Sequence, residues 1–165
     1  MLIKKSEESK LAKLKKDYKK LQEKYKLPSF EKLNEDFGIE KAIESETDFT
    51  IREIRKQISE KVYNYLRLVE TLINPVNAPM SIMSIVKAFG MDEKNKLVEI
   101  YKKLVKSEWE LIAIDLEFPE KKEAEFIKEM YEIWQHIKKD IVEVVEAVSV
   151  NWEAKTQSNN RKYFD

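Results

Sequence analysis

The chain has 165 residues, and its 31 lysines and arginines balance its 31 acids, with no cysteine, one histidine and two glycines. This composition excludes disulfides and cysteine-ligated zinc, and it argues against transition-metal centres and glycine-rich phosphate loops. Apolar residues are spread along the chain, so we expect neither a membrane span nor a leader and place the protein in the cytoplasm. The richness in lysine and glutamate also fits a heat-adapted source.

The first 27 residues form the segment most distinct in charge. They carry ten lysines against four acids, whereas residues 28–48 carry seven acids against two lysines. Apolar residues recur every three or four positions in the first segment, which predicts a helix over about residues 6–26 with a narrow coiled-coil seam. The seam consists of Leu11, Leu14, Tyr18, Leu21 and Tyr25. Because it is short, this helix needs support from its own chain or from a partner.

The acidic segment is predicted to contain one short helix. Ser29 can serve as its N-cap and Gly38 as its stop, with Phe30, Leu33 and Phe37 on one side. Attraction between this acidic segment and the basic first helix, as an internal electrostatic clasp, is a second possible role for the lysines.

Three longer helices follow. A capping box, Thr50 with Glu53, opens a helix predicted over residues 50–73, and two nearby prolines end it. The other two long amphipathic helices are predicted over residues 92–118 and 119–155, and a short apolar helix over about 79–89 lies before them. Trp109, Trp134 and Trp152 fall on apolar stripes, so we expect them in the core or in a groove.

These elements predict an all-α fold, an antiparallel bundle of three long helices with two short helices and the basic N-terminal helix packed outside it. We expect three parts, a basic helical arm over 1–27, a bundle domain over 28–155 and a polar flexible tail over 156–165.

Two carboxylates stand out within the predicted helix 92–118. Glu108 and Asp115 are seven residues apart on its apolar arc, and Arg55 is a candidate partner. A buried carboxylate must be paired, hydrogen-bonded or protonated. The three residues therefore predict either a small acid/base or cation site in a cleft, or a structural salt bridge with one carboxylate reaching solvent.

A metal centre is not expected. His136 follows Glu132 by four positions, whereas di-iron helical bundles repeat Glu-x-x-His on two helices, and the chain has no second histidine. The acidic residues around His136 are interpreted as a solvated helix face, and no cofactor is predicted.

The function that these features favour is a non-enzymatic helical interaction or adaptor protein. It would bind a partner protein or a second copy of itself through the N-terminal seam and through Tyr163 and Phe164, two aromatics in the polar tail. On this hypothesis, deleting residues 1–27 leaves the bundle folded but abolishes binding. No membrane contact and no small-molecule substrate is indicated.

Two alternatives stay open. The protein can instead be RNA- or ribosome-associated through the lysines of the first helix, although arginine is absent before residue 52. The lysines concerned are Lys13, Lys16, Lys19 and Lys20. The other alternative is an enzyme that uses Glu108, Asp115 and Arg55 in a cleft between helices.

Overall fold

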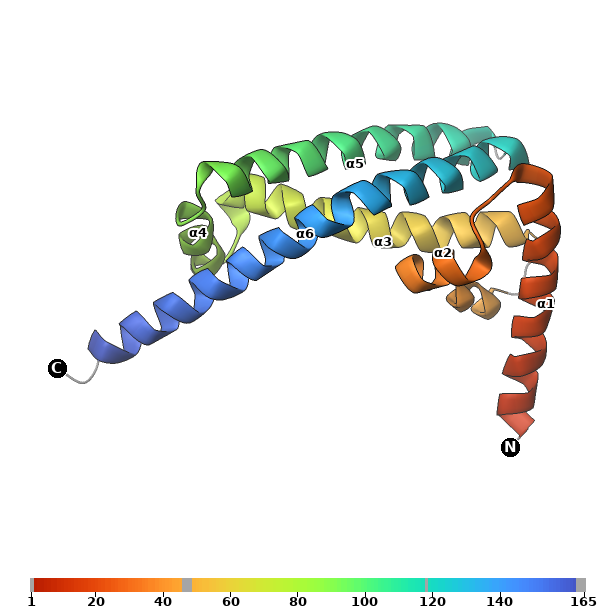
Figure 1. The fold of residues 1–165 in the computed structure, drawn as a ribbon, viewed down its shortest axis with the longest axis horizontal. Helices are drawn as coiled ribbons and strands as arrows, with labels where there is room; N and C mark the ends of the chain where they lie inside the picture. The colour runs from red at the N-terminus through yellow and green to blue at the C-terminus, as the bar shows by residue number, and fades with distance from the viewer. Residues whose placement is uncertain (1, 46–48, 118, 163–165) are drawn as a thin grey trace. The chain divides into compact units, whose positions relative to one another are not determined.

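The computed structural model describes residues 2–45, 49–117 and 119–162, with side chains over 8–45, 49–117 and 119–154. Over these residues the chain forms only helices, which confirms the all-α class (Figure 1). The α-helices are α1 (Leu2–Tyr25), α2 (Phe30–Phe37), α3 (Thr50–Ile73), α4 (Met80–Lys87), α5 (Met91–Glu117) and α6 (Glu120–Lys162), and the 3₁₀ helices are η1 (Ile39–Glu44) and η2 (Pro75–Asn77).

The chain divides into two compact units. Unit 1 comprises Met1–Tyr63 and Lys106–Ile133, and unit 2 comprises Asn64–Val105 and Trp134–Asp165. Each of the long helices α3, α5 and α6 contributes one part to each unit, and these helices pack together as the predicted bundle. Unit 1 also contains α1, α2 and η1, whereas unit 2 contains η2 and α4.

Local signals in the sequence set several helix ends. The Ser29 hydroxyl accepts a hydrogen bond from the backbone N–H of Lys32 and so caps α2, as predicted. Gly38 ends α2 with φ at 66°, a left-handed conformation that glycine adopts without a Cβ clash. The helix α3 spans the predicted range, whereas α6 continues past its expected end at Lys155 to Lys162.

The core of each unit is built from the inward faces of the long helices. In unit 1 the fully buried aliphatic side chains include Ile54, Ile58, Ile127 and Met130, together with Leu33 and Ile39. In unit 2 they include Leu66, Leu97, Ile100 and Leu104 of α3 and α5, together with Ile85 of α4.

The three tryptophans do not share one environment. Trp134 is buried in unit 2, where its ring lies 5.1 Å from that of Tyr65. Trp109 and Trp152 are more than half exposed, so of the two environments predicted for them, core or groove, the core is wrong. The rotation of α5 explains Trp109, because Leu104 and Ile114 take the inward positions of that helix.

Candidate functional site

The seam of α1 is partly used within unit 1. Leu14 and Tyr18 are buried, whereas the other three seam residues, Leu11, Leu21 and Tyr25, are only half-buried. The Tyr18 ring meets Phe30 of α2 edge-on at 5.7 Å, and its hydroxyl donates a 2.6 Å hydrogen bond to the carbonyl of Pro28. Leu14 and Tyr18 are thus already buried within unit 1. Deleting residues 1–27 should therefore lower the stability of unit 1.

The C-terminal end of α1 is tied to the start of α6. Glu120 Oε1 accepts hydrogen bonds from Lys24 Nζ at 2.8 Å and from the Tyr25 hydroxyl at 2.6 Å. The bond from Lys24, followed by that from Tyr25, lowers the pKa of Glu120, and the bond to Glu120 raises the pKa of Lys24. Lys24 and Glu120 are exposed, so their ion pair contributes little to the stability of the fold.

A lysine-rich surface remains on α1. The four lysines of the nucleic-acid alternative, Lys13, Lys16, Lys19 and Lys20, are all exposed. Lys20 forms an ion pair with Asp17 at 3.1 Å within the helix, and Lys15 lies over the Phe30 ring at 5.2 Å. The described part of α1 therefore presents a basic face to solvent while its seam packs on α2.

The structure brings Arg55 and Asp115 together in unit 1. Arg55 is buried in α3, and its Nη2 lies 2.6 Å from Asp115 Oδ1 of α5. Half of the Asp115 side chain is exposed, and Glu108 is half-buried. The expectation that both carboxylates lie in the apolar arc is therefore wrong for Asp115, because α5 is rotated about its axis relative to the predicted arc.

A carboxylate that was not predicted to be buried, Glu123, lies deeper than either of these two. Glu123 in the first turn of α6 is 1% exposed and accepts a hydrogen bond from Arg52 Nε at 3.3 Å. Burial raises the pKa of Glu123, and the bond from Arg52 opposes this rise only in part. The sequence contained a signal for this burial. Ile127 follows Glu123 by four positions and Met130 follows Ile127 by three, so all three lie on the inward stripe of α6.

The two arginines and the two carboxylates form a charge-balanced group, which we call the Arg–carboxylate cluster (Arg52, Arg55, Asp115 and Glu123). Arg55 Nε is buried and has no hydrogen-bond acceptor among the described atoms. The field of Arg55 acts on Glu123 as well as on Asp115. The cluster therefore joins α3, α5 and α6 within unit 1.

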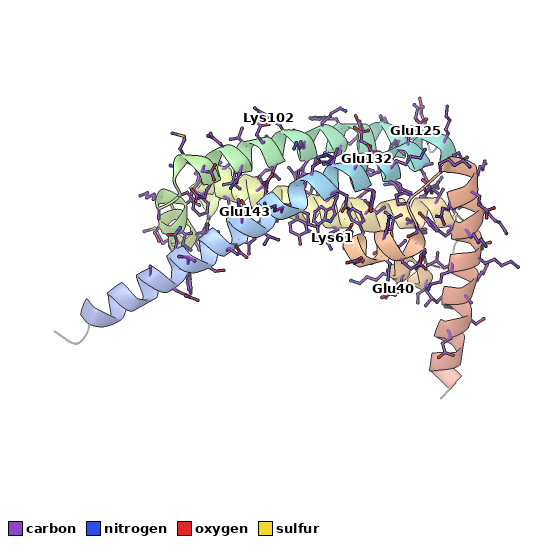
Figure 2. The ribbon with its side chains drawn as sticks, viewed as in Figure 1. Glu40, Lys61, Lys102, Glu125, Glu132 and Glu143 are labelled. Carbon is purple, nitrogen blue, oxygen red and sulfur yellow. The ribbon has the colours of Figure 1, made fainter. Side chains whose placement is uncertain are left out.

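Three further hydrogen bonds involve polar side chains of α3. Glu53 is buried and accepts hydrogen bonds from Ser45 at 2.6 Å and from Lys56 at 2.9 Å. Burial alone would raise the pKa of Glu53, but the bonds from Ser45 and Lys56 together outweigh it and lower the pKa. Lys61 of α3 donates to the backbone oxygen of Asp36 in α2 (Figure 2).

The outward side of α5 in unit 1 carries three large apolar side chains at spacings of three and four. Trp109 is 69% exposed, Ile112 48% and Leu116 78%, and we call them the α5 outer stripe. On the inward side of the same helix, Ser107 and Ile114 are buried. A stripe of this kind on a helix that already has a buried face is typical of a surface that contacts another macromolecule.

Unit 2 contains a hollow of about 500 Å³ at the C-terminal end of α3. Carboxylate, hydroxyl, amide and apolar groups line it, from Glu70, Thr71, Ile73, Asn74, Asn77, Ala78 and Tyr101. None of Glu108, Asp115 and Arg55 belongs to this lining.

His136 and Glu132 are exposed on α6, and Figure 2 labels Glu132. No group of three or more potential metal ligands occurs among the residues that the structure describes. No described helix has the length and apolarity of a bilayer crossing. Tyr163 and Phe164 lie outside the described residues.

No protein-family model matches the chain, and no curated protein or solved structure is detectably similar to it.

Proposed function

We propose that the protein is a non-enzymatic helical interaction protein whose main contact with a protein partner is the α5 outer stripe. The observation that supports this is the exposure of Trp109, Ile112 and Leu116 on one side of a helix. Full burial of one such side chain is worth about 1.5–3 kcal/mol. Covering the stripe would therefore contribute several kcal/mol toward the cost of association with a partner.

The N-terminal seam has a smaller part in this proposal than in the sequence-based hypothesis. Leu14 and Tyr18 are committed to intrachain packing, so only the half-buried Leu11, Leu21 and Tyr25 remain for a partner. An amphipathic helix that binds in a groove of its partner uses apolar anchors at spacings of three and four. The α5 outer stripe has such anchors.

The test is affinity capture from a lysate of the source organism with three versions of the full chain. The wild type is compared with the double variant Trp109→Ala, Leu116→Ala and with the control Lys103→Ala, which removes an exposed side chain elsewhere on α5. A partner retained by wild type and control but lost with the double variant supports the proposal. Equal retention by all three contradicts it.

RNA binding is the second candidate function, and the exposure of Lys13, Lys16, Lys19 and Lys20 favours it. Its signature is an affinity for RNA that falls steeply with added salt, because each neutralised phosphate releases a counterion. Changing the four lysines to Gln should flatten the salt dependence, whereas changing Lys102, Lys103, Lys121 and Lys122 should not. Absent or salt-insensitive binding would rule this candidate out.

An acid/base role for Glu108, Asp115 and Arg55 gains no support from their arrangement. Arg55 is engaged by Asp115, and the adjoining Arg52–Glu123 pair completes a charge-balanced group. We infer that the Arg–carboxylate cluster is structural and holds the three long helices of unit 1 together.

A further inference from the structure

The C-terminal part of α6, within unit 2, is apolar, and many of its side chains are exposed although Val144 is buried. Between Ile141 and Trp152 only Glu143 and Glu146 are charged. The side chains described from Val145 to Ala154 are all at least partly exposed. Four large apolar residues, Val142, Val145, Val150 and Trp152, are 43–64% exposed. Figure 1 shows this end of α6, in blue, extending past α4 of the same unit.

Such a segment has little reason to be helical alone. Five of the nine residues from Val142 to Val150 are valine, whose β-branched side chain lowers helix propensity. Most helical stability in proteins comes from packing of an apolar face. Val144 is buried within unit 2, whereas the exposed valines of the segment gain such packing only when another surface covers them.

The exposed residues define a coiled-coil register. Val142, Val145, Ser149 and Trp152 follow one another at spacings of three, four and three, which places them at alternating a and d positions. The flanking e positions are then Lys139, Glu146 and Glu153, all exposed.

We propose that a second copy of this chain covers the segment as an antiparallel, two-fold-related helix pair centred near Ala147. Val142 of one copy then packs against Trp152 of the other, and Val145 against Ser149. In an antiparallel pair the e positions face each other, so Lys139 of each copy lies beside Glu153 of its partner. This complementary pair occurs twice by symmetry, and it is what favours self-pairing over a foreign helix.

The same register also brings two like charges together. Glu146 of one copy lies close to Glu146 of the other beside the two-fold axis, where the two carboxylates repel. A parallel pair would separate these two residues and would not bring Lys139 beside Glu153. Charge changes at these positions therefore show whether the two helices are antiparallel as well as whether the two chains associate.

The test is the dimer dissociation constant of the full chain, measured by sedimentation equilibrium at low salt. Lys139→Glu or Glu153→Lys alone replaces two attractions by two repulsions, and each should raise the constant about tenfold. The double variant Lys139→Glu, Glu153→Lys should restore the wild-type value, and Glu146→Gln should lower it about twofold. Circular dichroism checks that every variant keeps its fold.

A protein that stays monomeric at all concentrations overturns the proposal, as does a dimer that ignores these charge changes. The inference is independent of the proposed function, because Trp109→Ala with Leu116→Ala should leave the dimer constant unchanged.

Discussion

Arg55 Nη2 and Asp115 Oδ1 lie 2.6 Å apart although sixty positions separate the two residues in the sequence. The guanidinium is buried and the carboxylate is half exposed, so the ion pair links the interior of unit 1 to its surface. Burial of a cation is tolerated only when it is paired and hydrogen-bonded. Asp115 is therefore the residue that makes Arg55 acceptable within the bundle.

The contributions of Arg55 and Asp115 to stability should be coupled. Asp115→Asn leaves a buried arginine with a weaker acceptor, and we expect a loss of about 1–2 kcal/mol in the free energy of unfolding, tempered by the exposure of Asp115. Arg55→Met with Asp115→Asn should lose less than the two single changes summed. Urea denaturation of the four proteins measures this coupling, and strictly additive losses would contradict it.

The Tyr18 hydroxyl should make the protein sensitive to alkali. Burial raises the pKa of Tyr18, so the folded state holds its proton at a pH where the unfolded chain releases it. Stability contributed by this group is complete below pH 10 and falls as the pH rises further. Tyr18→Phe should cost about 1 kcal/mol at neutral pH, through the lost bond to Pro28, and should reduce the decline in alkali. Tyr63→Phe, at an exposed position, serves as the control.

Two buried glutamates should respond to acid with opposite signs. The pKa of Glu53 is lowered on folding, so its stabilisation is present at neutral pH and is lost as the pH falls through 4.5 and below. The pKa of Glu123 is raised, so its protonation on acidification favours the folded state. Between pH 7 and acid, Glu53→Gln should therefore lose less stability than wild type, and Glu123→Gln should lose more. Thermal unfolding across pH checks both signs, and equal slopes would refute them.

Truncation should separate the two parts of α1. Deleting residues 1–10 leaves Leu14 and Tyr18 in place, and the melting temperature should change little. Deleting residues 1–27 removes Leu14 and Tyr18 and exposes Phe30, so unit 1 should be destabilised by several kcal/mol. Equal melting temperatures for both truncations would mean that α1 is a dispensable arm after all.

Periodicity and capping signals were enough to predict the six α-helices, though not the two 3₁₀ helices or the full length of α6. The Ser29 cap, the Gly38 stop and the full extent of α3 follow from local chemistry that needs no tertiary information. The rotation of α5 did not follow, because both sides of that helix carry apolar residues and the sequence alone does not say which side faces inward. Trp109 and Asp115 were misplaced for this one reason.

The candidate surfaces were predictable to different degrees. The lysine face of α1 was evident from composition, since charged side chains are exposed by default. The burial of Tyr18 required knowledge of α2, which supplies Phe30 as its neighbour. Glu123 was overlooked because an acid in a first helical turn is ordinarily interpreted as favourable to the helix dipole.

The most direct test of the proposed function is to ask what touches the α5 outer stripe. A photo-crosslinking amino acid placed at Ile112 of the full chain, in cells of the source organism, should form an adduct with a distinct protein partner. The same residue placed at Lys103, on another side of α5, should not. Adducts of equal yield at both positions, or an Ile112 position that crosslinks to nothing but solvent, would contradict a role for the stripe in partner binding.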